Sequence, residues 1–259
     1  MNILMVGTNP DFIMKEGGVA VRCRKLVTLF SPSSEVVSLN ASRQWSKAMD
    51  IPSAPSGNVT HKAYYFKQFY ICGKCAAIFT DLNIPFLLRI KNVVRREKID
   101  LIWVTGLYGV ISASLICPRT PVVYDGHGIV SEHAELYVER LKMDFKAVRG
   151  PIINKIVKWL LLSYIRWLER LTCQRAKHII AITELDRRRF IEKYTIDRNK
   201  ITTIPVWMAV DIFNKVVSKR KESAKSYKIN IIFLGSYHHP ANYEAFKLIE
   251  DYIAPEVKK

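Results

Sequence analysis

Short runs of apolar, β-branched residues alternate along the chain with longer segments of helical periodicity. The short runs are apolar on both faces, which is typical of strands in a parallel sheet that helices cover on both sides. Seven strands are predicted, at residues 2–6, 35–39, 100–104, 121–124, 178–182, 200–204 and 230–234. Helices are predicted between them, at residues 19–30, 85–98, 131–146, 152–176 and 184–194. This alternation predicts an α/β fold with a doubly wound parallel sheet.

Two places in the chain have the order of strand, glycine turn and helix with which a doubly wound domain begins. The first follows the strand at 2–6, and the second follows the strand at 230–234, which ends at Gly235 and leads into a helical pattern. We therefore predict an N-terminal Rossmann-like domain over residues 1–213, a Lys-rich linker over 214–228 and the opening strand and helix of a second Rossmann-like domain over 229–259. The Ser-, Ala- and Pro-rich stretch 40–57 is predicted to be a loop.

The charge and the cysteines narrow the class of protein. The 40 Lys and Arg residues against 23 Asp and Glu give a formal charge of +17, and such a surface attracts anions such as nucleotide phosphates, acidic lipids or nucleic acid. The five cysteines are an odd set, and no secretory signal precedes the first strand. Reduced thiols and a cytoplasmic location are the simplest interpretation. Cys72 and Cys75 have CxxC spacing, but no second pair completes a zinc site.

The apolar segment 152–171 leaves two interpretations open. Lys155, Lys158 and Arg166 interrupt it, so it does not have the length of uninterrupted apolar sequence that crosses a bilayer. Trp159 and Trp167 among basic residues would suit a helix in the head-group region of an anionic membrane. The alternative, which we favour, is a long helix packed on the sheet with its basic residues in water.

Two groups of residues are candidates for chemistry. Gly17 and Gly18 open the first helix, where backbone N–H groups approach a phosphate closely. His127 lies between two glycines just after the strand at 121–124, at the edge of the sheet where such folds place their ligand crevice. Asp125 and Glu132 are close to it in sequence. The spacing of His127, Glu132 and His133 matches no metal-ligand pattern, so we expect no metal site.

The order of these landmarks resembles the retaining glycosyltransferases of family 4, which have the two-domain GT-B fold. The matching segments are Gly17-Gly18, YDGHG with Glu132, Glu169 and Ala176 followed by HIIAITELDRRRFIEKY, KITTIPVWMAVDIF, and FLGSYHHPANYEAF. The resemblance covers nearly the whole chain. It also implies that the second domain extends well over a hundred residues beyond residue 259, so that this chain holds only its start.

The resemblance implies transfer of a sugar from a nucleotide-sugar donor with retention of anomeric configuration, and no bound metal or cofactor. His127 would contact the donor sugar as the catalytic residue. Gly17, Gly18, Gly235 and Ser236 would bind the donor, with Asp125 and Glu132 in supporting positions on the acceptor side. The basic helices favour an envelope, lipid-linked or polysaccharide acceptor, with the protein peripheral on the inner face of the cell membrane.

A second class of function stays open from the sequence. A non-catalytic basic α/β module that binds an anionic membrane or a protein partner would share the same composition. Nucleic-acid binding is not expected, because no recognised motif and no interleaving of aromatic and basic residues supports it.

Overall fold

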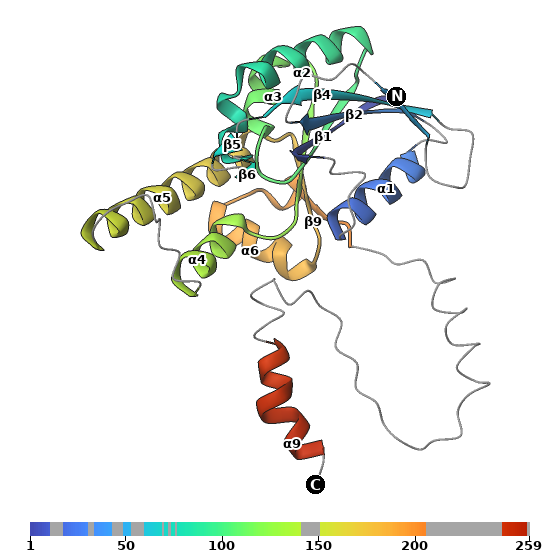
Figure 1. Ribbon diagram of the computed structural model, residues 1–259. Helices are drawn as coiled ribbons and strands as arrows, with labels where there is room; N and C mark the ends of the chain where they lie inside the picture. The colour runs from blue at the N-terminus through green and yellow to red at the C-terminus, as the bar shows by residue number, and fades with distance from the viewer. Residues whose placement is uncertain are drawn as a thin grey trace, which may run out of the picture. The chain divides into compact units, whose positions relative to one another are not determined.

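The computed structural model describes residues 1–10, 18–30, 34–42, 49–52, 60–68, 70–71, 74–75, 77–140, 151–205 and 245–257 (Figure 1). The chain divides into two units. The first consists of Met1–Ala134 and Gly150–Val206, and the second of Glu135–Arg149 and Trp207–Lys259. The predicted linker at 214–228, the strand at 230–234 and the site residues Gly17, Gly235 and Ser236 lie outside the described residues.

The first unit is built on an eight-stranded sheet in the order β10-β9-β8-β7-β1-β2-β4-β3. Seven strands are parallel, and β3 at the edge is antiparallel to β4. The predicted α/β fold with a doubly wound parallel sheet is confirmed. The strands are β1 (Asn2–Pro10), β2 (Glu35–Ser42), β3 (Met49–Pro52), β4 (Thr60–Lys67), β7 (Leu101–Thr105), β8 (Val122–Gly126), β9 (His178–Ala181) and β10 (Ile201–Thr203), and a separate ribbon pairs β5 (Tyr70–Ile71) with β6 (Lys74–Cys75).

The direction of winding reverses beside β1. The chain runs from β1 outward through β2 to β4, and then returns to place β7 on the other side of β1. From β7 it proceeds outward through β8, β9 and β10. Open α/β sheets bind ligands at the carboxyl ends of the strands next to such a reversal. The carboxyl ends of β1, β7 and β8 are therefore where this fold predicts a site.

Helices cover both faces of the sheet, with α2 and α3 on one side and α1 on the other (Figure 1). The larger core lies on the α2 and α3 side and includes Leu4, Ile102, Val104, Tyr124 and Phe86. The helical elements that begin in this unit are α1 (Gly18–Phe30), η1 (Ala77–Leu82), α2 (Ile84–Arg96), α3 (Val110–Ile116), α4 (Val130–Arg140, which enters the second unit at Glu135), α5 (Pro151–Arg175), α6 (Glu184–Tyr194) and η2 (Arg198–Lys200).

Local sequence explains where α2 and α6 begin. Asn83 accepts a hydrogen bond from the backbone N–H of Phe86, and Pro85 occupies the first turn, where its missing N–H costs nothing. Thr183 caps α6 by accepting from the N–H of Asp186, and its hydroxyl donates to the Asp186 carboxylate. The cap and the bounds predicted for α6 are confirmed.

Several elements differ from the sequence prediction. The loop predicted at 40–57 contains the end of β2 and all of β3, so that interpretation was wrong in part. Neither β4 nor α3 was predicted. Tyr64, Tyr65 and Phe66 are all buried in β4, because this strand is covered on both faces and so lacks the alternation that identifies a half-exposed strand.

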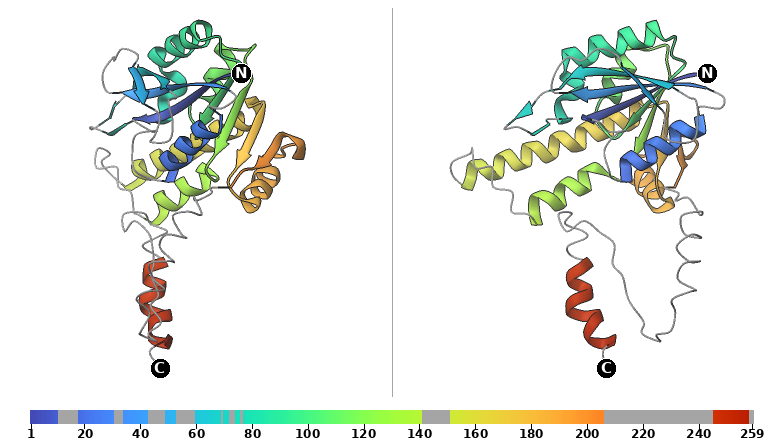
Figure 2. Two further views of the ribbon diagram at one scale, coloured as in Figure 1. Left: turned by 90° about the vertical axis from the view of Figure 1, so that its right-hand side faces the viewer. Right: turned by 45° about the vertical axis from the view of Figure 1, so that its right-hand side comes forward.

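The helix α5 is long and only partly packed. Its second half buries Ile165, Leu168 and Cys173, while its first half extends past the edge of the sheet in the right-hand view of Figure 2. Trp159 and Trp167 are 64% and 54% exposed. The favoured expectation of a packed helix with basic residues in water therefore holds only for the second half. Among the described residues, no helix combines the length and apolar character needed to cross a membrane.

In the second unit, residues 245–257 are helical. A π-helical turn, η3 (Ile249–Ile253), precedes α9 (Ala254–Val257), and Lys247 pairs with Glu250 at 2.8 Å. This agrees with the helix predicted after Gly235.

Candidate functional site

The site is built on the face of the sheet that α1 covers. Alternate residues of a strand point to opposite faces, so Tyr124 enters the main core while Asp125 points toward α1. On β7, next to β8, Trp103 points to the same face. Its ring packs against that of Phe30 on α1, with the ring centres 5.4 Å apart. Asp125 is thus a carboxylate at the carboxyl end of a central strand, buried between sheet and helix.

Asp125 is fully buried and is held mainly by Arg22 of α1. The Arg22 guanidinium donates Nη2 to Oδ1 at 2.9 Å and Nε to Oδ2 at 3.2 Å, a two-pronged ion pair. Trp103 Nε1 also donates to Oδ2, at 3.2 Å. Each of these contacts therefore stabilises the buried charge of the carboxylate, and a buried ion is tolerated only with such partners.

These neighbours set the ionisation of Asp125. Burial alone would raise the pKa of its carboxyl group, because a charge is disfavoured away from water. His127 and Arg22 act in the opposite direction and outweigh burial, so the pKa of Asp125 lies below its usual value. Asp125 is therefore a carboxylate at neutral pH.

His127 follows β8 directly, at the predicted edge. Its side chain is 21% exposed, and its Nε2 lies 3.6 Å from Asp125 Oδ2. That separation allows an ion pair but is too long for a hydrogen bond. Nε2 is buried and has no hydrogen-bond partner among the described residues. The structure brings together His127 and Asp125, two of the predicted site residues.

Gly126 and Gly128, on either side of His127, are each required for a different structural reason. Gly128 has φ +100°, in the left-handed region, and a Cβ there would lie 3.0 Å from Cε1 of His133. At Gly126, a Cβ would lie 3.1 Å from the Phe190 ring. A larger residue at either glycine of the YDGHG motif would therefore crowd its neighbours, and Gly128 also supplies the left-handed backbone conformation after His127.

Arg22 is the site residue that the sequence analysis missed. It lies one turn before Leu26 and beside Cys23, all on the buried side of α1. An arginine in an otherwise apolar helical stripe is a signal that a buried carboxylate faces it. Besides Asp125, its Nη1 donates to the carbonyl oxygens of Ile204 at 2.9 Å and Pro205 at 3.2 Å.

Glu132 and Glu169 have different surroundings. Glu132 is partly exposed on α4, where Lys193 and Arg189 of α6 lie 3.2 Å and 3.7 Å from its carboxylate. Glu169 is fully buried on α5 and accepts from the N–H groups of Val130 at 2.7 Å and Ser131 at 3.0 Å. Glu169 therefore caps the start of α4, the helix that follows the His127 turn.

Of the two glycines predicted to approach a phosphate, Gly18 lies in the described residues and is the first residue of α1. The predicted helix start is confirmed. The first turn of α1 holds no acidic residue, so within this helix no carboxylate offsets the positive end of its dipole. Among the described residues, no three His, Cys, Asp or Glu side chains gather as ligands for a metal ion.

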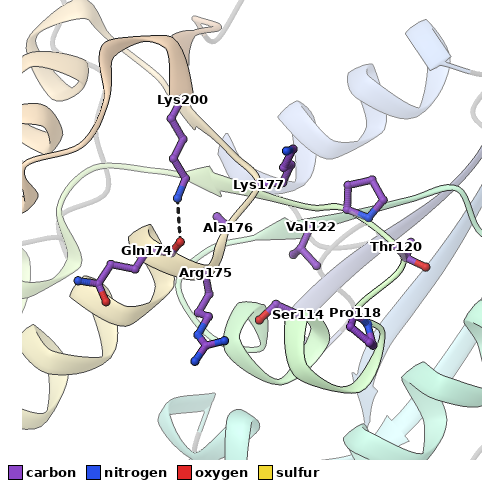
Figure 3. A pocket seen from close by; sticks show the side chains of 10 residues that line it. Ser114, Pro118, Thr120, Val122, Gln174, Arg175, Ala176, Lys177 and Lys200 are labelled. Atoms are coloured by element: carbon purple, nitrogen blue, oxygen red, sulfur yellow. Dashed lines mark hydrogen bonds between the residues drawn. The ribbon is translucent and has the colours of Figure 1, made fainter.

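A hollow of about 490 Å³ lies elsewhere, where β8, β9 and β10 begin (Figure 3). Arg175, Lys177 and Lys200 line it, and Lys200 Nζ donates to the Gln174 carbonyl at 2.8 Å. Burial lowers the pKa of Lys200. This is the amino edge of the sheet, opposite to the edge that holds His127. Because α/β sheets place ligands at the carboxyl edge, we assign the candidate site to His127 and not to this hollow.

Comparison with known protein families places the whole chain in a family. The model of the family described as Glycosyltransferase Family 4 matches residues 64–208, which is more than half of the chain. The chain belongs to glycosyltransferase family 4. The matched residues include Asp125, His127, Glu132 and Glu169. No curated protein matches the sequence of this family 4 chain.

Solved structures show the same fold at low sequence identity. A sucrose-phosphate synthase from Thermosynechococcus elongatus is 11% identical with a TM-score of 0.57, over 82% of this chain and 49% of that one. A second structure of that enzyme is 8% identical with a TM-score of 0.50, over 87% of this chain and 100% of that one. Anabaena HepE, solved in complex with UDP, is 14% identical with a TM-score of 0.47, over 86% and 50%.

The two synthase structures show the fold, which is that of the GT-B glycosyltransferases. This family 4 chain spans about half the length of the first synthase structure.

Proposed function

We propose that this chain forms the acceptor-side half of a retaining glycosyltransferase that takes its sugar from a nucleotide-sugar donor. The observation that carries the proposal is His127, which stands at the carboxyl end of β8 beside the buried carboxylate of Asp125. This is the edge, next to the reversal of the sheet, where the fold places ligands. Family membership supplies the reaction class.

The proposed roles combine the positions of α1 and His127 with the family resemblance. The donor diphosphate lies at the start of α1, where the backbone N–H groups that follow Gly17 and Gly18 stabilise the charge that develops as it leaves. His127 contacts the donor sugar near the reacting carbon. Gly235 and Ser236 bind the donor from the second domain. The proposed reaction uses no resident metal or cofactor, because helix dipole and backbone amides supply the positive potential.

The test compares histidines in the full-length protein. Release of nucleoside diphosphate is measured from a panel of nucleotide sugars, with lipid-linked and polysaccharide acceptors, and the anomeric configuration of the product is read by NMR. His127→Ala should lower transfer by about 100-fold, the order expected for loss of one stabilising contact in the transition state. His178→Ala is the matched control, because His178 starts β9 at the opposite edge of the sheet and bonds Thr202 there. Transfer by His127→Ala at the parent rate would refute the proposal.

A second function is favoured by α5. Its exposed side carries Ile153, Ile156, Trp159, Leu160 and Trp167. Lys155, Lys158, Arg166 and Arg170 lie on the same helix, and no acidic residue occurs from 151 to 168. Exposed tryptophans among cations are the composition of a helix that lies in the head-group layer of an anionic membrane. We propose that α5 docks the enzyme on such a membrane, where a lipid-linked acceptor would be within reach.

Vesicle sedimentation tests this docking. The protein should bind vesicles that contain phosphatidylglycerol at low salt and leave them at high salt, because exposed charges are screened. Replacing Ile156, Trp159 and Trp167 by serine should abolish binding. Replacing Leu82 and Leu88 by serine is the control, since these exposed leucines belong to η1 and α2. Absence of binding to anionic vesicles at low salt would remove the proposal, as would equal loss in both variants.

A further inference from the structure

Arg22 binds two parts of the first unit at once, the carboxylate of Asp125 and the backbone at Ile204 and Pro205. Its Nε and Nη2 hold Asp125, and its Nη1 holds the carbonyl oxygens of Ile204 and Pro205. Ile204 and Pro205 directly precede Val206, the last residue of the first unit. The same guanidinium therefore grips both the carboxylate beside His127 and the segment by which the chain leaves this unit.

The contact between Asp125 and His127 is close to a hydrogen bond without forming one. His127 Nε2 lies 3.6 Å from Oδ2, and a typical N–H···O bond is about 3.0 Å long, so an approach of about 0.6 Å would complete it. Nε2 is buried and unpartnered among the described residues, so the bond would satisfy a buried polar atom. A small displacement of Asp125 is thus enough to change the hydrogen bonding of His127.

The guanidinium can transmit such a displacement. It is planar and rigid, and here it is about 98% buried, since its residue is only 2% exposed. Water cannot readily replace the bonds on either side of it. If residues 204–205 shift, Arg22 has to follow, and its two-pronged ion pair carries Asp125 with it.

We propose that Arg22 is a positioning residue that couples the exit segment at Ile204 and Pro205 to the orientation of His127. This coupling rests on the proposed function in one respect, namely that His127 contacts the donor sugar. When the Nε2–H group bonds Asp125, Nδ1 becomes the acceptor nitrogen and the plane of the ring is fixed. The ring then presents an acceptor to a donor-sugar hydroxyl in one orientation. Without the bond, the ring is free to turn.

The test reads the imidazole directly. Ring ¹⁵N signals of His127 are recorded by NMR at one fixed pH in the parent protein, in Arg22→Met and in Arg187→Met. Arg187 is a matched control, because it also donates to carbonyl groups next to β10, those of Ile201 and Arg198, but its carboxylate partner is Glu184 on the surface. The His127 signals should shift in Arg22→Met, because Asp125 is no longer held in place, and should stay where they are in Arg187→Met.

Transfer kinetics give a second readout. Because Arg22 acts through His127, Arg22→Met should lower kcat by about 10- to 100-fold and change the KM for the donor much less, as expected for a misplaced group. Arg22→Lys should restore part of the loss, since one ammonium group can hold the carbonyl oxygens or Asp125 but not both in the same geometry.

The two proposals fail in different ways. Unchanged His127 signals in folded Arg22→Met overturn the coupling, even if His127→Ala abolishes transfer. If the His127 signals shift in Arg22→Met but the parent protein itself transfers no sugar, the positioning role is supported and the proposed function is refuted. If Arg22→Met does not fold, Arg22→Lys takes its place in the NMR comparison. Unchanged signals in that variant overturn the coupling as well.

Discussion

Glu169 offers a sharp test of how the site is supported. Its carboxylate is fully buried and serves three donors, the backbone N–H groups of Val130 and Ser131 and the hydroxyl of Tyr194. The Ser131 hydroxyl in turn lies 3.1 Å from the Tyr194 oxygen. Glu169→Ala removes the acceptor for all three donors at once, in a place that is closed to solvent.

The size of the effect follows from these contacts. Leaving a buried donor without an acceptor costs about 1–3 kcal/mol, and bonds to a charged acceptor are at the upper end. Since water can enter the space and relaxation recovers part of the loss, we expect Glu169→Ala to lower the free energy of unfolding by about 3–5 kcal/mol. For a protein of this size, about 3 kcal/mol lowers the Tm by roughly 6–12 °C. Glu169→Gln keeps the shape and one acceptor oxygen, so we expect about half that loss.

The measurement is equilibrium unfolding by urea and by heat, followed by circular dichroism. Glu192→Gln is the control, because Glu192 is exposed on α6 and a surface change of this kind costs less than about 0.5 kcal/mol. Hydrogen exchange locates the effect, since the amides of Val130 and Ser131 should lose protection first. A Glu169→Ala protein as stable as Glu192→Gln would refute the argument that this carboxylate holds the start of α4.

Three further outcomes are expected. Asp125→Asn should cost about 3 kcal/mol at pH 7, because it leaves the Arg22 charge buried without its partner. The pKa of Asp125 is lowered on folding, so its stabilisation is present above its unfolded pKa of about 4 and is lost as pH falls through the folded value. Urea unfolding from pH 7 downward should therefore show parent and variant converging in acid. Gly128→Ala should cost about 1–2 kcal/mol, since it strains a left-handed backbone position beside His133, and a Tm scan measures this. Thr183→Ala should lower stability by about 1 kcal/mol in the same assay, through loss of the α6 cap.

The sequence predicted those elements whose signals are local. The strands β1, β2, β7, β8, β9 and β10 and the helices α1, α2, α5 and α6 were found within a few residues of their bounds, because period, caps and turn residues all lie within them. The helix α3 was missed because it has seven residues and takes its cap from Asp81, which bonds the N–H groups of Gly109 and Ser112 from 28 and 31 residues away. A partner at that distance leaves no pattern in a local window.

The site divides in the same way. His127 was predicted because a histidine between glycines at a strand end is a local feature that the fold rule interprets. Arg22 was missed because its meaning comes from Asp125, 103 residues away. Glu169 was noticed only as part of a family resemblance, and the structure supplies its reason: it caps a helix that begins 39 residues earlier. Residues that support a site from a distance are visible only when the sheet brings them together.

The placement of Asp125 depends on which residues of β7 and β8 face each side of the sheet. Ile102, Val104 and Tyr124 enter the main core, so Trp103 and Asp125 must take the face toward α1. A slip of β8 by one residue would put the carboxylate into the apolar core and Tyr124 against Arg22. Burial of Tyr124 against Phe190, at 6.1 Å between ring centres, opposes that slip. The core packing on one face of the sheet therefore determines the position of the Asp125 carboxylate on the other face, and with it the surroundings of His127.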